Sequence, residues 1–232
     1  MFGAPLRAVR SAHLLARGGA SEMDEGLHLL ARIGIAPATI VDVGASDGRW
    51  ARSAHSAFRA ADLVLFEPQP AHVPALERFQ LENPKAKIIR SAVGRAGGSS
   101  WFDAADPFGG ILLEQKTSDS IAVSVTTLDE ALAAAKPPFL VKLDTHGAES
   151  AILEGARETL TRSVAWVIEA YNQRFSGECM LFWELCCFMG EHGFRPIDIL
   201  DVSRRPYDGT LWQMDVCFVR ADWPGFGYIG YR

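Results

Sequence analysis

Short, almost continuously apolar segments alternate with helical patterns along most of this chain. Strands are predicted at residues 38–43, 62–66, 87–93, 139–143 and 164–168, with two late strands at 194–200 and 215–220. Strands that lack an apolar–polar alternation are buried on both faces, which is typical of a parallel sheet covered by helices on both sides. The pattern therefore predicts an α/β fold built on a mostly parallel sheet.

Segments of helical periodicity separate the strands. They follow the first strand as far as about residue 58 and then cover residues 70–81, 148–160 and 179–192. A capping box formed by Thr127 and Glu130 predicts a further short helix. The two late strands have no convincing helix between them, so we expect them to end the sheet as an antiparallel hairpin.

The chain has 232 residues, of which 48% are hydrophobic, enough to bury one sizeable core. We expect one domain over residues 38–232, preceded by a helical extension at residues 1–37, where Ser21 and Asp24 give a weak cap signal. Residues 94–120 are rich in glycine and irregular. They are predicted to form a small hairpin or a loop near the functional site.

Composition limits the partners and the compartment. The formal net charge of -5 argues against nucleic acid, because phosphate binding requires a basic surface. No apolar run is long enough for a membrane span, and a homo-oligomer stays open. The cysteines form no CxxC pair, so we interpret them as small buried side chains in a reducing, cytoplasmic environment. They are Cys179, Cys186, Cys187 and Cys217.

The strongest single motif is Ile40-Val-Asp-Val-Gly-Ala-Ser-Asp-Gly48. It predicts a buried strand that ends in a glycine turn and continues into a helix. Gly44 permits close approach of a ligand to the backbone, and the helix start offers unpaired N–H groups. In an open α/β sheet, ligands bind in the crevice beyond such strand ends.

A second acid supports a nucleoside-type ligand. Glu67 ends the next strand roughly twenty residues after the glycine turn, where a carboxylate can accept the hydroxyl protons of a ribose. The dinucleotide fingerprint G-x-G-x-x-G is missing, and Asp42 would repel a pyrophosphate but attract an ammonium group. These features favour S-adenosylmethionine over NAD.

Several motifs together resemble the FkbM family of S-adenosylmethionine-dependent methyltransferases. They are VDVGASDG (41–48), FEPQP (66–70), SAVG (91–94), TTLDE (126–130), VKLDTHGAESAILEGA (141–156) and VIEAY (167–171). The resemblance implies a class I, Rossmann-like methyltransferase fold: a three-layer sandwich with seven strands, the last one antiparallel. It also implies O-methylation of a hydroxyl on a small molecule, natural product or sugar. Ser46-Asp47 departs from the family, where Asn followed by an apolar residue is frequent.

The predicted cofactor contacts come from four strand ends. They are Asp42, Val43, Gly44, Ala45 and Gly48; Glu67, Pro68 and Gln69; Ser91, Ala92 and Val93; and Asp144 and Thr145. The histidines other than His146 have no partner at a useful spacing, and we interpret them as surface or packing residues. They are His13, His28, His55, His72 and His192.

The catalytic candidates follow the fourth and fifth strands: Asp144, His146 and Glu169. A hydroxyl acceptor loses its proton as the new bond forms, so a base within hydrogen-bond reach helps. We expect His146 to be that base, because its ordinary pKa lies near 6.5, and Asp144 to orient it. The alternative is that His146 only caps the next helix or bonds a carbonyl.

Other side chains near these candidates have two interpretations. Glu149 fits either the site or a favourable charge at a helix start. Glu169 could bind substrate hydroxyls or, with Asp144 and Asp215, hold a divalent metal, although the spacing requires none and we expect no metal. Trp212 and Tyr207 could stack on an apolar or sugar acceptor or pack in the core.

Three functions therefore stay open. An O-methyltransferase acting on a small hydroxylated or carbohydrate acceptor is favoured. The absence of the G-x-G-x-x-G fingerprint argues against a Rossmann-type oxidoreductase using NAD. A non-catalytic, methyltransferase-like binding module is opposed by the intact acids Asp42, Glu67 and Asp144.

Overall fold

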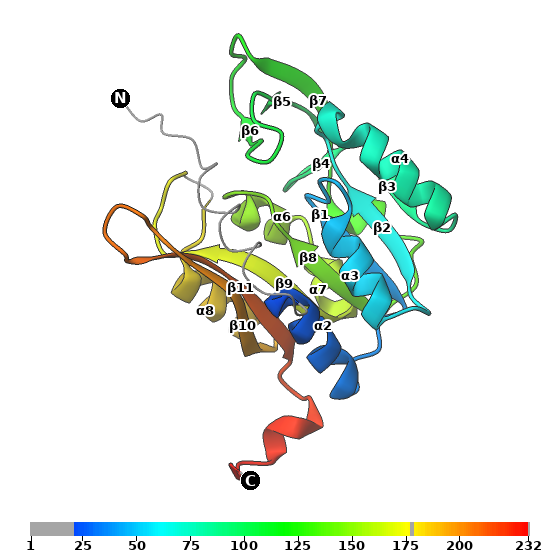
Figure 1. Cartoon of the computed structure of the whole chain (residues 1–232), viewed down its shortest axis with the longest axis vertical. Coiled ribbons are helices and arrows are strands. Elements are labelled where there is room, and N and C mark those ends of the chain that lie inside the picture. Colours follow the sequence, from blue (N-terminus) through cyan, green and yellow to red (C-terminus); the bar gives the residue numbers. More distant parts are fainter. Residues whose placement is uncertain (1–20, 177–178, 232) are drawn as a thin grey trace.

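Figure 1 shows the computed structural model, which describes residues 21–176 and 179–231. Of the expected extension at residues 1–37, residues 1–20 lie outside the described part. The remainder forms α2 (Glu22–Arg32), which begins at the predicted Ser21–Asp24 capping box. None of the described helices is both long and apolar enough to cross a membrane.

The large sheet has seven strands and confirms the predicted α/β fold. Its order is β10 (Phe194–Arg204), β11 (Leu211–Arg220), β9 (Ser163–Tyr171), β8 (Phe139–Leu143), β1 (Thr39–Val43), β2 (Asp62–Phe66) and β3 (Lys87–Ile89). Strand β11 runs opposite to the other strands of this sheet, so the predicted antiparallel last strand is confirmed. Strands β9, β10 and β11 are longer than predicted.

Helices cover both faces of this sheet, as the apolar strands require. Ile40 and Leu140 pack in one cluster with the helices on their face, which are α2, α3 (Arg49–Ala57) and α4 (Val73–Glu82). Val41 and Val141 pack in another with α5 (Leu128–Ala131), α6 (Glu149–Glu154), α7 (Arg157–Arg162) and α8 (Phe182–Glu191). The result is a three-layer arrangement, with short 3₁₀ turns at Pro70–His72 (η1) and Pro224–Gly227 (η2).

The single strand predicted at residues 87–93 is wrong. It divides into β3 and β4 (Ala92–Val93), because the Ser91 N–H bonds the Ile89 carbonyl at 2.9 Å and turns the chain out of the large sheet. Strand β4 joins a second sheet in the order β4, β7 (Ser120–Thr126), β5 (Gly98–Asp103), β6 (Leu112–Leu113). The hairpin expected within residues 94–120 is therefore present, as part of a four-stranded sheet (Figure 1).

The helix predicted at residues 148–160 is two helices, α6 and α7, separated at Gly155. A Cβ at Gly155 would lie 2.5 Å from the Gly94 carbonyl oxygen. Helix α7 starts afresh on a cap from another element: the Asp129 carboxylate accepts the N–H of Glu158 at 3.0 Å and of Thr159 at 2.7 Å. Such a distant cap has no signature in the local sequence.

The cysteine interpretation holds in part. Cys179 and Cys217 are buried, Cys186 is half-buried, and Cys187 is exposed, which corrects its placement in the interior. Cys186 and Cys187 both lie on helix α8, whose buried residues are Leu185 and Met189. Adjacent residues on a helix point in different directions, so Cys186 and Cys187 cannot share one buried face.

The tertiary cap on α7 gives a first testable prediction. Asp129→Ala should lower the free energy of unfolding by about 2 kcal/mol, because two N–H groups and the Thr159 hydroxyl lose a charged acceptor. Urea denaturation measures the difference. The matched control Asp222→Ala removes an aspartate that is 83% exposed and should change stability by less than about 0.5 kcal/mol. Equal effects of the two variants would contradict the cap.

Candidate active site

The site lies where β1, β2 and β8 end side by side. Connections from the two sides of the sheet diverge between β1 and β8, which is the position of the ligand crevice in open α/β sheets. Gly44 follows β1 with φ +81°, and a Cβ there would lie 2.1 Å from the Asp144 carbonyl oxygen. Only glycine lets the two strand ends approach so closely.

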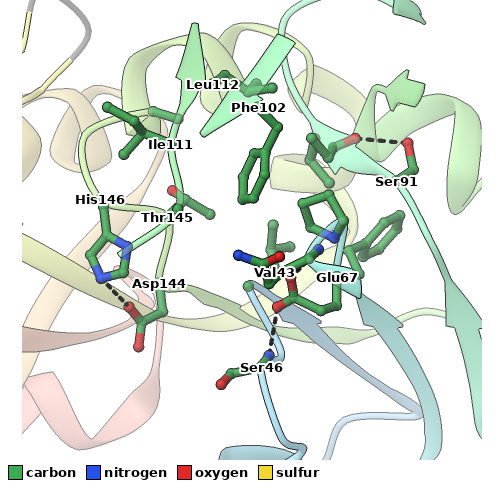
Figure 2. Close-up of a pocket in the computed structure, with 18 of the residues that line it drawn as sticks. Val43, Ser46, Glu67, Ser91, Phe102, Ile111, Leu112, Asp144, Thr145 and His146 are labelled. Atoms are coloured by element: carbon green, nitrogen blue, oxygen red, sulfur yellow. Dashed lines mark hydrogen bonds and ion pairs between the residues drawn. The ribbon is translucent and has the colours of Figure 1, made fainter. Parts of the chain in front are cut away.

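Glu67 lies at the end of β2 and is held by backbone donors. Its Oε2 accepts the N–H of Ser46 at 2.7 Å, and its Oε1 accepts the N–H of Gln69 at 2.7 Å. Burial raises the pKa of Glu67, while these two donors act in the opposite direction. Each carboxylate oxygen keeps a further lone pair, so Glu67 can also bind the hydroxyls of a ligand. Figure 2 shows it beside Ser46 and Val43 in the pocket.

These strand ends line a cleft with about 690 Å³ of empty space, a volume that includes its part open to solvent. Its walls also contain Phe102, Ile111 and Leu112 from the second sheet, on the side opposite Ser46 and Glu67 (Figure 2). Among the described residues that line the cleft, none is Lys or Arg, and the carboxylates are Glu67 and Asp144. The cleft is therefore suited to an uncharged or cationic ligand, not to a pyrophosphate.

Most of the residues predicted to contact a cofactor line this cleft. They are Val43, Gly44, Glu67, Pro68, Gln69, Ser91, Ala92, Val93, Asp144 and Thr145. Asp42, Ala45 and Gly48 do not. Asp42 and Ala45 are buried, and Gly48 is the left-handed N-cap of α3 and faces Leu76 and Phe79. These three shape the turn from beneath.

Asp42 is 1% exposed, and its Oδ2 has no hydrogen-bond partner among the described residues. Burial raises its pKa to about 7, although the charge of Lys142 opposes the shift. A buried carboxyl with an unused oxygen costs free energy unless a donor or cation reaches it. The atom is thus a ready acceptor beneath the glycine turn.

The three catalytic candidates come together. His146 Nε2 lies 3.7 Å from Asp144 Oδ1 and 3.9 Å from Glu169 Oε2. His146 has a left-handed backbone with φ 52°, a strained conformation for a non-glycine residue. Figure 2 shows its ring at the edge of the pocket with one nitrogen turned toward Asp144.

Glu169 lies within β9 and not beyond its end. It is 1% exposed, its Oε1 accepts the Gln213 side-chain amide at 2.6 Å, and its Oε2 accepts the Tyr171 hydroxyl. Burial raises the pKa of Tyr171, and the charge of Glu169 adds to the effect. The phenol therefore stays protonated and donates, which fixes the carboxylate beside His146.

The metal set considered from the sequence is corrected. Asp215 is not part of it, because its Oδ1 lies 2.6 Å from Lys142 Nζ. Burial lowers the pKa of Lys142, but Asp215, Asp144 and Glu169 outweigh it and raise that pKa above its ordinary value. The lysine thus stays charged. The ligand atoms that do converge belong to Asp144, His146 and Glu169, all within 4.8 Å of one another, a donor set that could hold a divalent cation.

Glu149 supports the turn that carries His146. Its Oε1 accepts the N–H of Gly147 at 2.9 Å, and the side chain is 1% exposed. Burial raises its pKa to about 7. Glu149 thus lies in the first turn of α6, as the sequence indicated, but it is buried and bonds the turn that carries His146.

Of the two interpretations of His72, packing is confirmed and a surface position is wrong, since its ring contacts Phe108. His72 is 5% exposed, and its Nε2 lies 2.7 Å from the Pro107 carbonyl oxygen and 3.2 Å from Ser46 Oγ. The expectation that residues 94–120 lie near the site is confirmed, because residues from this segment line the cleft. Which of its side chains would do so was not predicted, because the segment shows no period. Of the other histidines, His13 lies outside the described residues, His28 and His192 are exposed, and His55 is half-buried.

Comparisons with known proteins agree with this geometry. The family model for the methyltransferase FkbM domain matches residues 42–196. The fold is similar to a methyltransferase FkbM from Methylobacillus flagellatus KT (TM-score 0.52, 16% identity over 77% of this chain), of which the match spans 43%. It is also similar to a protein from Klebsiella pneumoniae provisionally assigned as an O-methyltransferase (TM-score 0.53, 14% identity, 89% and 83% of the two chains). No curated protein gives a significant match.

The buried acid beneath the glycine turn predicts a pH dependence of stability. The pKa of Asp42 is about 7 in the folded chain and near 3.8 when unfolded, so between these values the folded state binds more protons. Stability therefore falls as pH rises toward 7, by at most about 1.4 kcal/mol per pH unit for this group. Urea denaturation from pH 5 to 8 measures the free energies of unfolding of Asp42→Asn and the wild type. The stability of the variant relative to the wild type should rise with pH up to about pH 7 and stay constant above it. A difference in unfolding free energy between Asp42→Asn and the wild type that does not vary with pH would contradict the raised pKa of Asp42.

Proposed function

The chain belongs to the methyltransferase FkbM family, and we propose that it transfers the methyl group of S-adenosylmethionine to a hydroxyl of a small molecule or sugar. The observation that carries the choice of cofactor is the charge of the cleft: carboxylates and no Lys or Arg among its described walls. S-adenosylmethionine carries a sulfonium and an ammonium group, whereas NAD carries two phosphates. A carboxylate-lined cleft favours the former.

The residues present fit this cofactor. Glu67 has lone pairs available for ribose hydroxyls, and the Gly44 backbone lines the cleft. The unused Oδ2 of Asp42 and the partly exposed Asp144 supply negative charge for the cationic methionine end. When bound, the cofactor supplies a methyl group activated by its positive sulfur.

His146 is proposed as the general base. Both carboxylates near its Nε2 can only accept, which favours a proton on Nε2 and leaves Nδ1 to take the proton of the acceptor hydroxyl. As the oxygen–methyl bond forms, that proton moves to His146, and Asp144 and Glu169 stabilise the resulting imidazolium. The present separations exceed hydrogen-bond range and would have to shorten in the complex with substrate.

The surroundings of this base suggest the kind of acceptor. Phe175 and Trp212 stack with their centroids 6.1 Å apart at 29°, and both contact the Tyr171 ring that serves Glu169. Phe175 is 40% exposed. An uncharged acceptor with an apolar face suits these rings, while Asp144 and Glu169 oppose an anionic one. Tyr207, by contrast, is 90% exposed and paired with Arg205.

Binding of S-adenosylhomocysteine tests the cofactor directly. Calorimetry should show wild-type binding and a roughly ten- to hundredfold weaker affinity for Glu67→Gln, since a charged acceptor for ribose is lost. Glu77→Gln is the matched control, because Glu77 is 59% exposed on α4 and pairs only with Arg90 in the described structure; its affinity should match the wild type. Binding of NAD in place of S-adenosylhomocysteine would contradict the proposal.

The base assignment predicts a split between binding and turnover. Under saturating cofactor, His146→Ala should lower kcat by about 10²- to 10⁴-fold with little change in affinity for S-adenosylhomocysteine. His192→Ala, at an exposed histidine bonded to the Phe188 carbonyl, should leave both unchanged. Unchanged turnover in His146→Ala would exclude the base. Loss of wild-type activity in EDTA would instead indicate that Asp144, His146 and Glu169 hold a metal.

A further inference from the structure

Residues 102–112 form the wall of the cleft opposite Glu67, called here the outer wall. This part of the molecule is poorly stabilised by itself. Strand β6 has two residues and pairs with β5 only at Trp101–Leu113 and Phe102–Leu112. The cluster that the second sheet forms apart from the main core has three buried residues, Ala92, Phe102 and Val123. Strand β6 is the short edge strand of the four-stranded sheet. The connection that precedes it gains little from strand pairing, so its position depends on contacts made from outside the sheet.

Those contacts come from the segment that follows Glu67. The side-chain amide of Gln69 donates to the carbonyls of Ala104 and Asp106 at 3.3 and 3.4 Å. His72 Nε2 lies 2.7 Å from the Pro107 carbonyl oxygen, which can only accept, so this nitrogen must carry the proton. Three carbonyls of the connection between β5 and β6 are thereby bonded to two side chains.

Packing supports the same attachment. The His72 ring contacts the Phe108 ring with centroids 5.1 Å apart. Phe108 is otherwise 54% exposed. Both Gln69 and His72 are at least nine-tenths buried, although polar residues of their kind usually face water. The hydrogen bonds of these two buried side chains hold the connection between β5 and β6 in place.

The wall and the ribose acid are also joined. The N–H of Gln69 bonds one oxygen of Glu67, and the N–H of Ser46 bonds the other. His72 Nε2 in turn lies 3.2 Å from Ser46 Oγ. Gln69 therefore both orients Glu67 and bonds the wall, and His72 lies next to Ser46, the other residue that orients Glu67.

The wall places apolar groups directly opposite Glu67. Phe102, Ile111 and Leu112 line the cleft there (Figure 2). A Cβ at Gly110 would lie 2.3 Å from Phe102 Cζ, so the connection passes closely over that ring. A displaced connection would therefore move Phe102 and open this side of the cleft.

We infer that Gln69 and His72 are positioning residues that hold residues 104–112 closed over the nucleoside half of the cofactor. This inference rests on the proposed function for the nature of the ligand. The mechanism needs no chemistry from either side chain. Loss of the side-chain hydrogen bonds of Gln69 or of His72 leaves Glu67 in place but loosens the wall. The bound cofactor should then dissociate faster.

Matched variants separate this role from general stability. Gln69→Leu and His72→Phe remove the donors while keeping size, and the latter keeps a ring against Phe108. Gln80→Leu removes a glutamine that donates to the Ala86 carbonyl at 2.9 Å, and His192→Phe removes a histidine that bonds the Phe188 carbonyl at 2.8 Å. Both controls change the same chemistry outside the residues that line the cleft.

Two measurements are made on each full-length variant: amide hydrogen exchange without ligand, and the affinity and dissociation rate of S-adenosylhomocysteine. Gln69→Leu and His72→Phe should each speed exchange at residues 103–113 while exchange in β1 and β8 stays unchanged, which also shows that the fold persists. Each should bind about two- to tenfold more weakly, through faster dissociation. The controls should match the wild type in both respects.

The outcomes distinguish the inference from the proposed function. Unchanged exchange and affinity in both variants, with a wild type that binds S-adenosylhomocysteine, would overturn the positioning role alone. A wild type that does not bind the compound would overturn the proposed cofactor, and with it the ligand assigned to the wall.

Discussion

The close approach of β1 and β8 is the contact on which the rest of the site depends. Gly44 leaves room for the Asp144 carbonyl, which would lie 2.1 Å from any Cβ at that position. The N–H groups of Gly44 and Ala45 also bond the Phe66 carbonyl at 3.0 Å, which ties the same turn to β2. One glycine thus brings together the strand end that carries Glu67 and the one that carries Asp144 and His146.

The second organising constraint is an excess of buried negative charge. Asp42, Glu67, Glu149 and Glu169 are all buried around the cleft, and Lys142 is the one lysine or arginine buried among the described residues. Burial raises the pKa of Asp42 and Glu149 to about 7, so the protein spends stability to keep these acids there. A cationic ligand bound in the cleft would relieve part of that cost.

Much of the fold was predictable because its signals are local. The buried strands β1, β2 and β8, the glycine turn and the capping boxes at Ser21 and Thr127 were all readable from short stretches. The division of residues 87–93 was not, because it depends on the pairing of β4 with β7, more than twenty residues away. The break between α6 and α7 likewise depends on Asp129, which belongs to another helix.

The site divides in the same way. The cleft residues at strand ends were predicted, because parallel strands must end at one edge of the sheet. Residues 94–120 were expected near the site, but the side chains that face the cleft and the contact of His72 with Pro107 were not predicted, because they depend on which loop folds over which. The pairing of Asp215 with Lys142 was also missed: the two residues lie on different strands, and nothing in either neighbourhood indicates the ion pair.

A crystal structure of the complex with S-adenosylhomocysteine tests the central claim most directly. We expect ribose hydroxyls within hydrogen-bond distance of the Glu67 carboxylate, the amino-acid end beside Gly44, and the sulfur facing the Asp144–His146–Glu169 cluster. A ligand bound outside this cleft, or one whose sulfur faces away from His146, would contradict it.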